Sequence, residues 1–286
     1  MLRRFAKILL LALTIALILT IAYTILFGGF AQSLTGEEHS IYYRKTIRYM
    51  NKTAYYIAIK KPALDVDPSD LLKIHEYYIR EYNKLLNTRG VKYEELATLE
   101  TYLNLSKTVN NLYNMSLDWP SIWVVLTKST EALSEMDIDK ALSLYKANEH
   151  RILALRESVN ETLTILEHTK YVKYTPIEHQ KVVNYTIDVL KKILDLLDEY
   201  IKLMELLKYY HSSLSNAIQT RNSTEIKNIG ETIVEQIDLE KLDGLTGNVS
   251  DFLSQLLSGL PERSSSQSTQ PYAGEGGGYT GGPAND

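Results

Sequence analysis

The chain has 286 residues, with 31 basic and 35 acidic side chains and no cysteine. The absence of cysteine excludes disulfides, thiolate metal sites and cysteine nucleophiles. The formal net charge of −4 argues against nucleic acid as a partner, because binding to phosphates favours a basic surface.

The first 31 residues are predicted to contain a membrane-spanning helix. Residues 1–7 carry Arg3, Arg4 and Lys7, and residues 8–31 have no charged side chain. Residues 8–27 alone would form about 30 Å of helix, which matches the hydrocarbon core of a bilayer. The positive-inside rule places residues 1–7 in the cytoplasm and the C-terminus outside. We therefore expect a single-pass cell-membrane protein with an N-terminal signal-anchor.

The alternative is a secretory signal peptide cleaved after Ala31, at the small-x-small motif Gly29-Phe30-Ala31. The apolar stretch is longer than the roughly 7–15 residues of a typical signal peptide, so we favour the uncleaved anchor. In both interpretations the same part of the chain, residues 32–286, lies outside the cell. This part has 28 basic and 35 acidic residues, and its net charge near −7 argues against anionic lipid headgroups as a partner.

Asn-x-Ser/Thr sequons support an exterior location, and we treat each as a candidate N-glycosylation site. They occur at Asn51, Asn104, Asn114, Asn160, Asn184, Asn222 and Asn248. The content of asparagine, serine and threonine predicts roughly two sequons by chance, so seven is an enrichment. The combination of many sequons with no cysteine fits an archaeal surface protein.

After a linker at residues 32–40, residues 41–260 are predicted to form an all-α ectodomain, a multi-helix bundle of antiparallel helical hairpins. Helix starts are marked by Asp67 before Pro68, by the capping box at Thr175, and by Asn222. Trp119-Pro120 predicts a break between two helices. The expected helices are 39–61, 68–89, 92–117, 119–135, 138–169, 176–221, 223–240 and 248–259.

Residues 183–210 show the strongest helical pattern, with two adjacent apolar seams and a charged opposite face. One seam is Ile187, Leu190, Leu194, Leu197, Ile201 and Met204, and the other is Val189, Ile193, Leu196, Tyr200, Leu203, Leu207 and Tyr210. Together they cover about half of the circumference, which favours a helix packed on both flanks over a two-stranded coiled coil. The charged face predicts solvated i,i+4 pairs, Lys191–Asp195 and Asp198–Lys202.

Residues 132–144 resemble residues 217–229 at an offset of 85, which suggests an internal repeat. Two helical hairpins with polar caps at their bends would also produce this similarity.

The aromatic residues are expected to be structural. Tyr42, Tyr49 and Tyr56 recur every seven residues, and a half-buried seam is preferred to a partner or membrane strip. Trp119 and Trp123 are expected to pack in the core.

Known catalytic and metal motifs are missing from the sequence. No Glu-x-x-His motif for a di-iron site is present, and Glu-His neighbours at 149–150, 167–168 and 178–179 predict surface histidines. Asp137 and Asp139 are expected to serve a helix start. We therefore expect no cofactor, no metal and no catalytic site.

Residues 261–286 are rich in glycine and serine and are expected to be disordered. The sequence therefore favours a non-enzymatic, membrane-anchored protein of the cell envelope that acts in structure or by binding a protein partner or a second copy. The alternative is a ligand-sensing or solute-binding ectodomain that works with a membrane partner. An exported enzyme of unrecognised type is a third class.

Overall fold

The computed structural model describes residues 37–88, 90–170 and 177–259. The predicted membrane segment at 8–31 and the predicted disordered tail at 261–286 lie outside these ranges. Within them every regular element is a helix, which confirms the all-α prediction. None of these described helices is long and apolar enough to cross a membrane.

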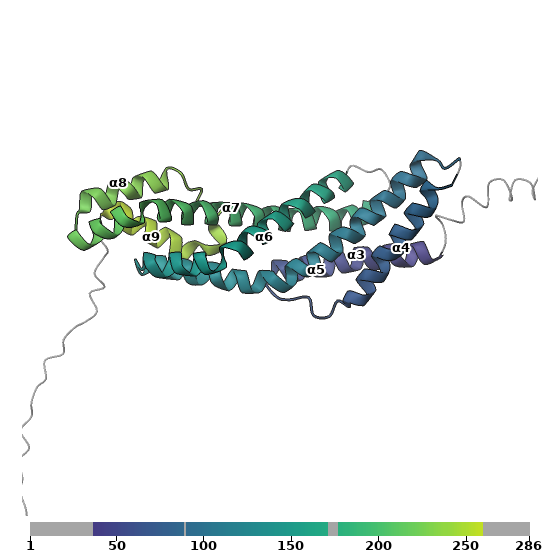
Figure 1. The fold of residues 1–286 in the computed structure, drawn as a ribbon, viewed down its shortest axis with the longest axis horizontal. Coiled ribbons are helices and arrows are strands. Elements are labelled where there is room, and N and C mark those ends of the chain that lie inside the picture. The colour runs from purple at the N-terminus through teal and green to yellow at the C-terminus, as the bar shows by residue number, and fades with distance from the viewer. Residues whose placement is uncertain (1–36, 89, 171–176, 260–286) are drawn as a thin grey trace, which may run out of the picture.

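The helices run up and down as antiparallel neighbours (Figure 1). In chain order they are α3 (Glu37–Ala58), α4 (Pro68–Leu86), α5 (Tyr93–Ser134), α6 (Ile138–Lys170), α7 (Ile177–Thr220), α8 (Ser223–Val234), the 3-10 turn η2 (Asp243–Leu245) and α9 (Thr246–Ser258). The first helix begins inside the segment predicted as a linker at 32–40, and α8 ends six residues before its predicted end at 240.

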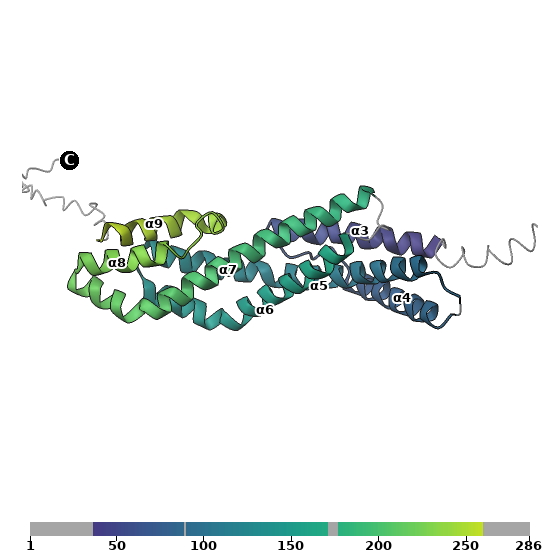
Figure 2. The same ribbon diagram turned by 90° about the horizontal axis from the view of Figure 1, so that it is seen from above.

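The bundle is elongated, and its two ends are built from different hairpins. Helices α5, α6 and α7 run along the middle, α3 and α4 pack at one end, and α8 and α9 pack at the other (Figures 1 and 2). The described chain therefore begins at one end of the long axis and finishes at the opposite end. With 44 residues, α7 is about 66 Å long.

The two predicted seams of α7 form the centre of the core. Leu190, Leu197 and Met204 of the first seam and Tyr200 and Leu203 of the second are completely buried. This is possible because α7 packs against α3 and α6 and, near its C-terminal end, against α8. The prediction of a helix packed on both flanks is confirmed.

Three helix ends share one bend geometry, with a non-glycine residue in the left-handed region. These residues are Lys60 (φ 59°), Met136 (φ 60°) and Arg221 (φ 54°). In each bend the next amide donates to the carbonyl five residues earlier, at 2.9 Å, which is the Schellman arrangement. The last two bends are 85 residues apart and the first lies outside that repeat, so this capping motif is not specific to the two similar segments.

The helix break predicted at Trp119-Pro120 is wrong, because α5 continues through Pro120. A proline inside a helix lacks the amide hydrogen of one backbone bond and costs about 3 kcal/mol. Here Trp119, Ile122 and Leu126 are buried on either side of the proline. Packing of α5 against several helices offsets a cost that would end an isolated helix.

The i,i+4 ion pairs predicted along α7 are wrong, because Lys191, Asp195 and Asp198 pair with other segments, whereas Lys202 pairs with Glu199 at i,i+3. The observed ion pairs are Lys191–Glu167, Lys241–Asp195 and Arg156–Asp198. Glu199 also departs from the prediction, because it is 8 % exposed and accepts a hydrogen bond from the amide of Asp238 at 3.1 Å. This carboxylate attaches the segment after α8 to α7.

Pro120→Ala should raise the free energy of unfolding by about 1–3 kcal/mol, because alanine restores a helical amide at a position whose backbone is already helical. Urea unfolding followed by circular dichroism measures the change. The control is Val124→Ala, an exposed substitution one turn later that should stay within about 0.5 kcal/mol of the parent. Destabilisation by Pro120→Ala would show that the proline itself contributes essential packing.

Candidate functional site

A cluster of aromatic rings joins α3, α4 and α5 at the end of the bundle where α3 begins. Ring contacts at centroid distances of 4.5–5.7 Å run from His39 on α3 through Tyr77 and Tyr78 on α4 to Tyr102 on α5 and back to Tyr43 on α3. Tyr78 is fully buried. Because aromatic pairs add to simple area burial, this cluster holds α4 to the remainder of the bundle.

The buried cluster ends in a polar contact with α7. The Tyr43 hydroxyl and His179 Nδ1 are 2.9 Å apart, so this histidine, predicted to lie on the surface, is half-buried against the cluster. Burial raises the pKa of Tyr43 and Tyr78 well above the usual range, so both remain protonated at physiological pH. Burial also lowers the pKa of His75, whose Nδ1 lies 2.9 Å from the Ser106 hydroxyl.

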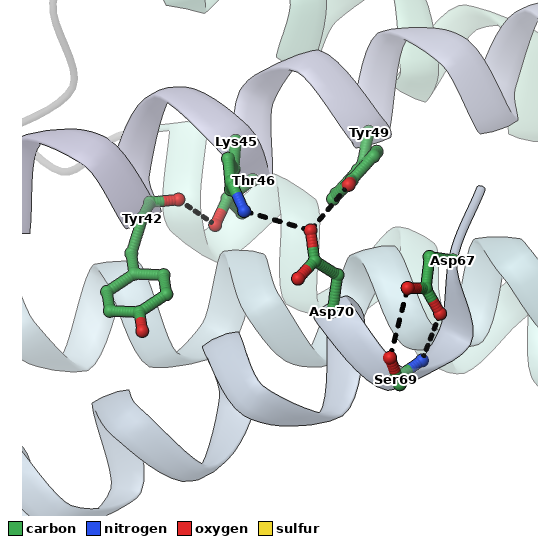
Figure 3. Close-up of polar contacts among 7 residues, drawn as sticks. All are labelled: Tyr42, Lys45, Thr46, Tyr49, Asp67, Ser69 and Asp70. Carbon is green, nitrogen blue, oxygen red and sulfur yellow. Dashed lines mark hydrogen bonds and ion pairs between the residues drawn. The ribbon is translucent and has the colours of Figure 1, made fainter.

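A polar cluster on the outside of the same end connects α3 to the start of α4 (Figure 3). The carboxylate of Asp70 accepts hydrogen bonds from Lys45 at 2.9 Å and from the Tyr49 hydroxyl at 2.8 Å. Asp67 caps α4 by accepting from the Ser69 amide at 2.9 Å, as the sequence predicts. The polar groups converge on one another and fix the angle between the two helices.

These contacts change the pKa of the groups involved. The hydrogen bonds from Lys45 and Tyr49 hold the pKa of Asp70 below its usual range. Burial, together with the hydrogen bond to Asp70, raises the pKa of Tyr49 to about 12. The tyrosine seam is therefore structural, as preferred from the sequence, although Tyr49 uses its hydroxyl to bind a carboxylate.

A shallow surface groove of about 410 Å³ lies between α3 and α7. It is lined by Arg48, Asn51, Lys52, Tyr55 and Tyr185. Its two cations and two partly exposed tyrosines could contact an anionic or aromatic group. The groove opens to solvent, and it includes the asparagine of one predicted glycosylation site.

Among the helices that the structure describes, α4 has the longest row of exposed aliphatic side chains. Leu72, Ile79 and Leu86, spaced seven residues apart, are 54 %, 39 % and 52 % exposed. The opposite face of α4 packs mainly on α5. A row of this kind on one side of a helix is the pattern that a partner helix or another apolar surface covers.

The structure places the seven sequons at very different positions. Asn51, Asn114, Asn160 and Asn184 are exposed within α3, α5, α6 and α7, and Asn104 is half-buried in α5. In these five sites the hydroxyl residue of the sequon is buried; the five are Thr53, Ser106, Ser116, Thr162 and Thr186. Only at Asn222 and Asn248 is the hydroxyl residue, Thr224 or Ser250, exposed.

The two aspartates singled out in the sequence lie at the start of α6. Asp137 caps α6 by accepting from the Lys140 amide at 3.0 Å, as expected. Asp139 lies 2.6 Å from His211, on the surface. Within residues 37–88, 90–170 and 177–259, no three acidic or histidine side chains converge as metal ligands. Trp119 is buried, and Trp123 packs against the core beneath Lys60.

Comparison with known protein families, with curated proteins and with solved structures finds no match to this chain.

Asp70→Asn should lower the free energy of unfolding at pH 7 by about 1 kcal/mol, because the amide loses the ion pair with Lys45 and accepts more weakly from Tyr49. A lowered folded-state pKa stabilises above the unfolded-state value of about 4, and the benefit disappears as pH falls through the folded value. The difference between variant and parent should therefore shrink in acid.

Urea unfolding at pH 7, 5, 4 and 3 measures this difference, with the exposed Asp251→Asn as the control. A gap between Asp70→Asn and the parent that stays constant down to pH 3 would contradict the assigned role of Asp70.

Proposed function

We propose that this chain is a non-enzymatic, N-terminally anchored and glycosylated cell-envelope protein. In this proposal its helical bundle is a rigid spacer that binds other proteins outside the membrane. The observation that carries the proposal is the position of the two ends: the described chain begins with α3 at one end of the long axis and finishes after α9 at the other (Figures 1 and 2).

This arrangement suits a spacer for a physical reason. If residues 8–31 cross the membrane, the five residues between 31 and 37 reach at most about 17 Å, so the α3–α4 end lies beside the bilayer. A helix of 44 residues then carries the α8–α9 end about 66 Å along the bundle axis. Long helices packed over their whole length resist bending, because bending would open the buried seams of α7.

The charge and the apolar side chains at the two ends of the bundle are consistent with the proposed binding of other proteins. Residues 37–92 contain 11 basic and 7 acidic side chains, whereas residues 221–258 contain 3 basic and 7 acidic ones. This charge difference favours an acidic partner surface at the α3–α4 end and a basic one at the α8–α9 end. The row Leu72, Ile79 and Leu86 on α4 offers an apolar surface at the basic end.

A ligand-sensing ectodomain is the second candidate, and the groove between α3 and α7 is the feature that favours it. Its cationic and aromatic lining suits a small anion. The spacer is preferred because the groove is open to solvent and a glycan on Asn51 would occupy it.

Membrane fractionation tests the anchored location. The chain should remain with native membranes after an alkaline carbonate wash, dissolve only in detergent, and retain residues before Gln32 in mass spectrometry of the mature N-terminus. A chain that begins at Gln32 and appears in the medium would replace anchoring with secretion, and recovery from the cytosol would contradict export altogether.

Site-specific photo-cross-linking in native membranes tests the binding face. A photoreactive amino acid at Ile79 should give protein adducts, because this side chain is proposed to contact a partner. The matched control is Leu153 on α6, which is 42 % exposed against 39 % for Ile79. An adduct with the mass of two chains identifies a second copy. Equal labelling at both positions would contradict a binding face on α4.

A further inference from the structure

Helical geometry divides the seven sequons into two kinds. The asparagine and the hydroxyl residue of a sequon are two positions apart, which on a helix is a rotation of about 200° around the axis. The two side chains therefore lie on opposite faces of the helix. Five sequons fall inside helices in this way, and their hydroxyl residue is turned into the bundle. Thr53, Ser116, Thr162 and Thr186 are completely buried, and Ser106 is 2 % exposed.

Several of these buried hydroxyls already have partners. Thr53 donates to the carbonyl of Tyr49 at 2.8 Å, and Thr186 donates to that of Val182 at 2.8 Å. A transferase that recognises asparagine and hydroxyl together would have to unwind the helix and expose its core. In α9, Asn248 and Ser250 flank Val249, which is completely buried, so unwinding that turn also removes a core side chain.

Asn222 differs from the other six. It lies between the end of α7 at Thr220 and the start of α8 at Ser223, with a non-helical backbone (φ −78°, ψ 84°). All three residues of its sequon, Asn222, Ser223 and Thr224, are exposed. The bend is at the end of the bundle opposite the start of α3 (Figure 1).

The geometry points to Asn222 as the one sequon that accepts a glycan after the chain has folded, with the other six accepted only before their helices form. The inference rests on the proposed exterior location. The donor class is an oligosaccharide linked to a lipid pyrophosphate. A bond forms between Asn222 Nδ2 and the anomeric carbon, the bond from that carbon to the pyrophosphate oxygen breaks, the lipid pyrophosphate leaves, and Nδ2 loses one proton.

The modification is compatible with the cap that Asn222 provides. Its Oδ1 accepts from the Glu225 amide at 3.2 Å, and its Nδ2 donates to Glu225 Oε2 at 3.0 Å. An asparagine Nδ2 carries two hydrogens, and only one is replaced by the sugar. Both the cap and the second hydrogen bond can therefore persist, so glycosylation here need not unwind α8.

The test uses the full chain, produced without glycans and purified in detergent, with a single-subunit oligosaccharyltransferase and a short lipid-pyrophosphate-linked oligosaccharide. Seven short peptides, one for each sequon, report how well each site is accepted without a fold. The inference expects several peptides to react, whereas the folded chain gains one glycan, located at Asn222 by mass spectrometry.

Three variants test whether the modification depends on the sequon at Asn222. Asn222→Gln and Thr224→Ala should each abolish the single modification, and Ser223→Ala, which keeps the sequon, should retain it. Thr224→Ala leaves the Asn222 cap in place, and circular dichroism checks that each variant is folded. The assay contains no native membrane, so its outcome is separate from the tests of export and anchoring.

Three outcomes would overturn the inference. The folded chain could be modified at helical sites as readily as the peptides, it could stay unmodified at Asn222 while the matching peptide reacts, or the Asn222 peptide could itself fail as an acceptor.

Discussion

The burial of two adjacent seams on α7 is the constraint on which the bundle depends. A helix with one narrow apolar stripe needs a single partner, whereas α7 must be covered on both flanks, and α3, α6 and α8 cover it. Because α7 packs against both α3 and α8, one helix from each end of the bundle is attached to the same central helix. Loss of packing at Leu197 or Tyr200 would therefore affect both ends together.

Polar groups determine how the hairpins attach to that core. Asp70 receives Lys45 and Tyr49 where α4 begins, and Glu199 receives the Asp238 amide where α8 has ended. Each is a carboxylate that satisfies donors on a neighbouring segment, so each fixes an orientation that apolar packing alone would leave adjustable. At the α8–α9 contact a small residue has the same effect, because a Cβ on Gly230 would lie 2.8 Å from Leu256 Cβ.

The same packing relates the sequons to the fold. On an amphipathic helix, an exposed asparagine followed two residues later by a buried threonine or serine is a natural product of alternating faces. Buried hydroxyls such as Thr53 and Thr186 satisfy themselves on their own helix, so they can fill the interface between helices at little cost. Part of the sequon enrichment therefore has a structural cause, which the sequence count could not separate from selection for glycosylation.

The sequence by itself determined the helices and several of their ends, because capping is local: Asp67, Asp137 and Asn222 each bind amides within three residues. It also determined the double seam of α7, because helical periodicity is a property of neighbouring residues. Only the tertiary structure decided that α5 continues through Pro120, since the compensating contacts come from other helices. Tertiary structure likewise determined which residues pair with the charged face of α7, and it determined that Glu199 and five sequon hydroxyls are buried. Each of these features depends on which segments, distant in sequence, pack together.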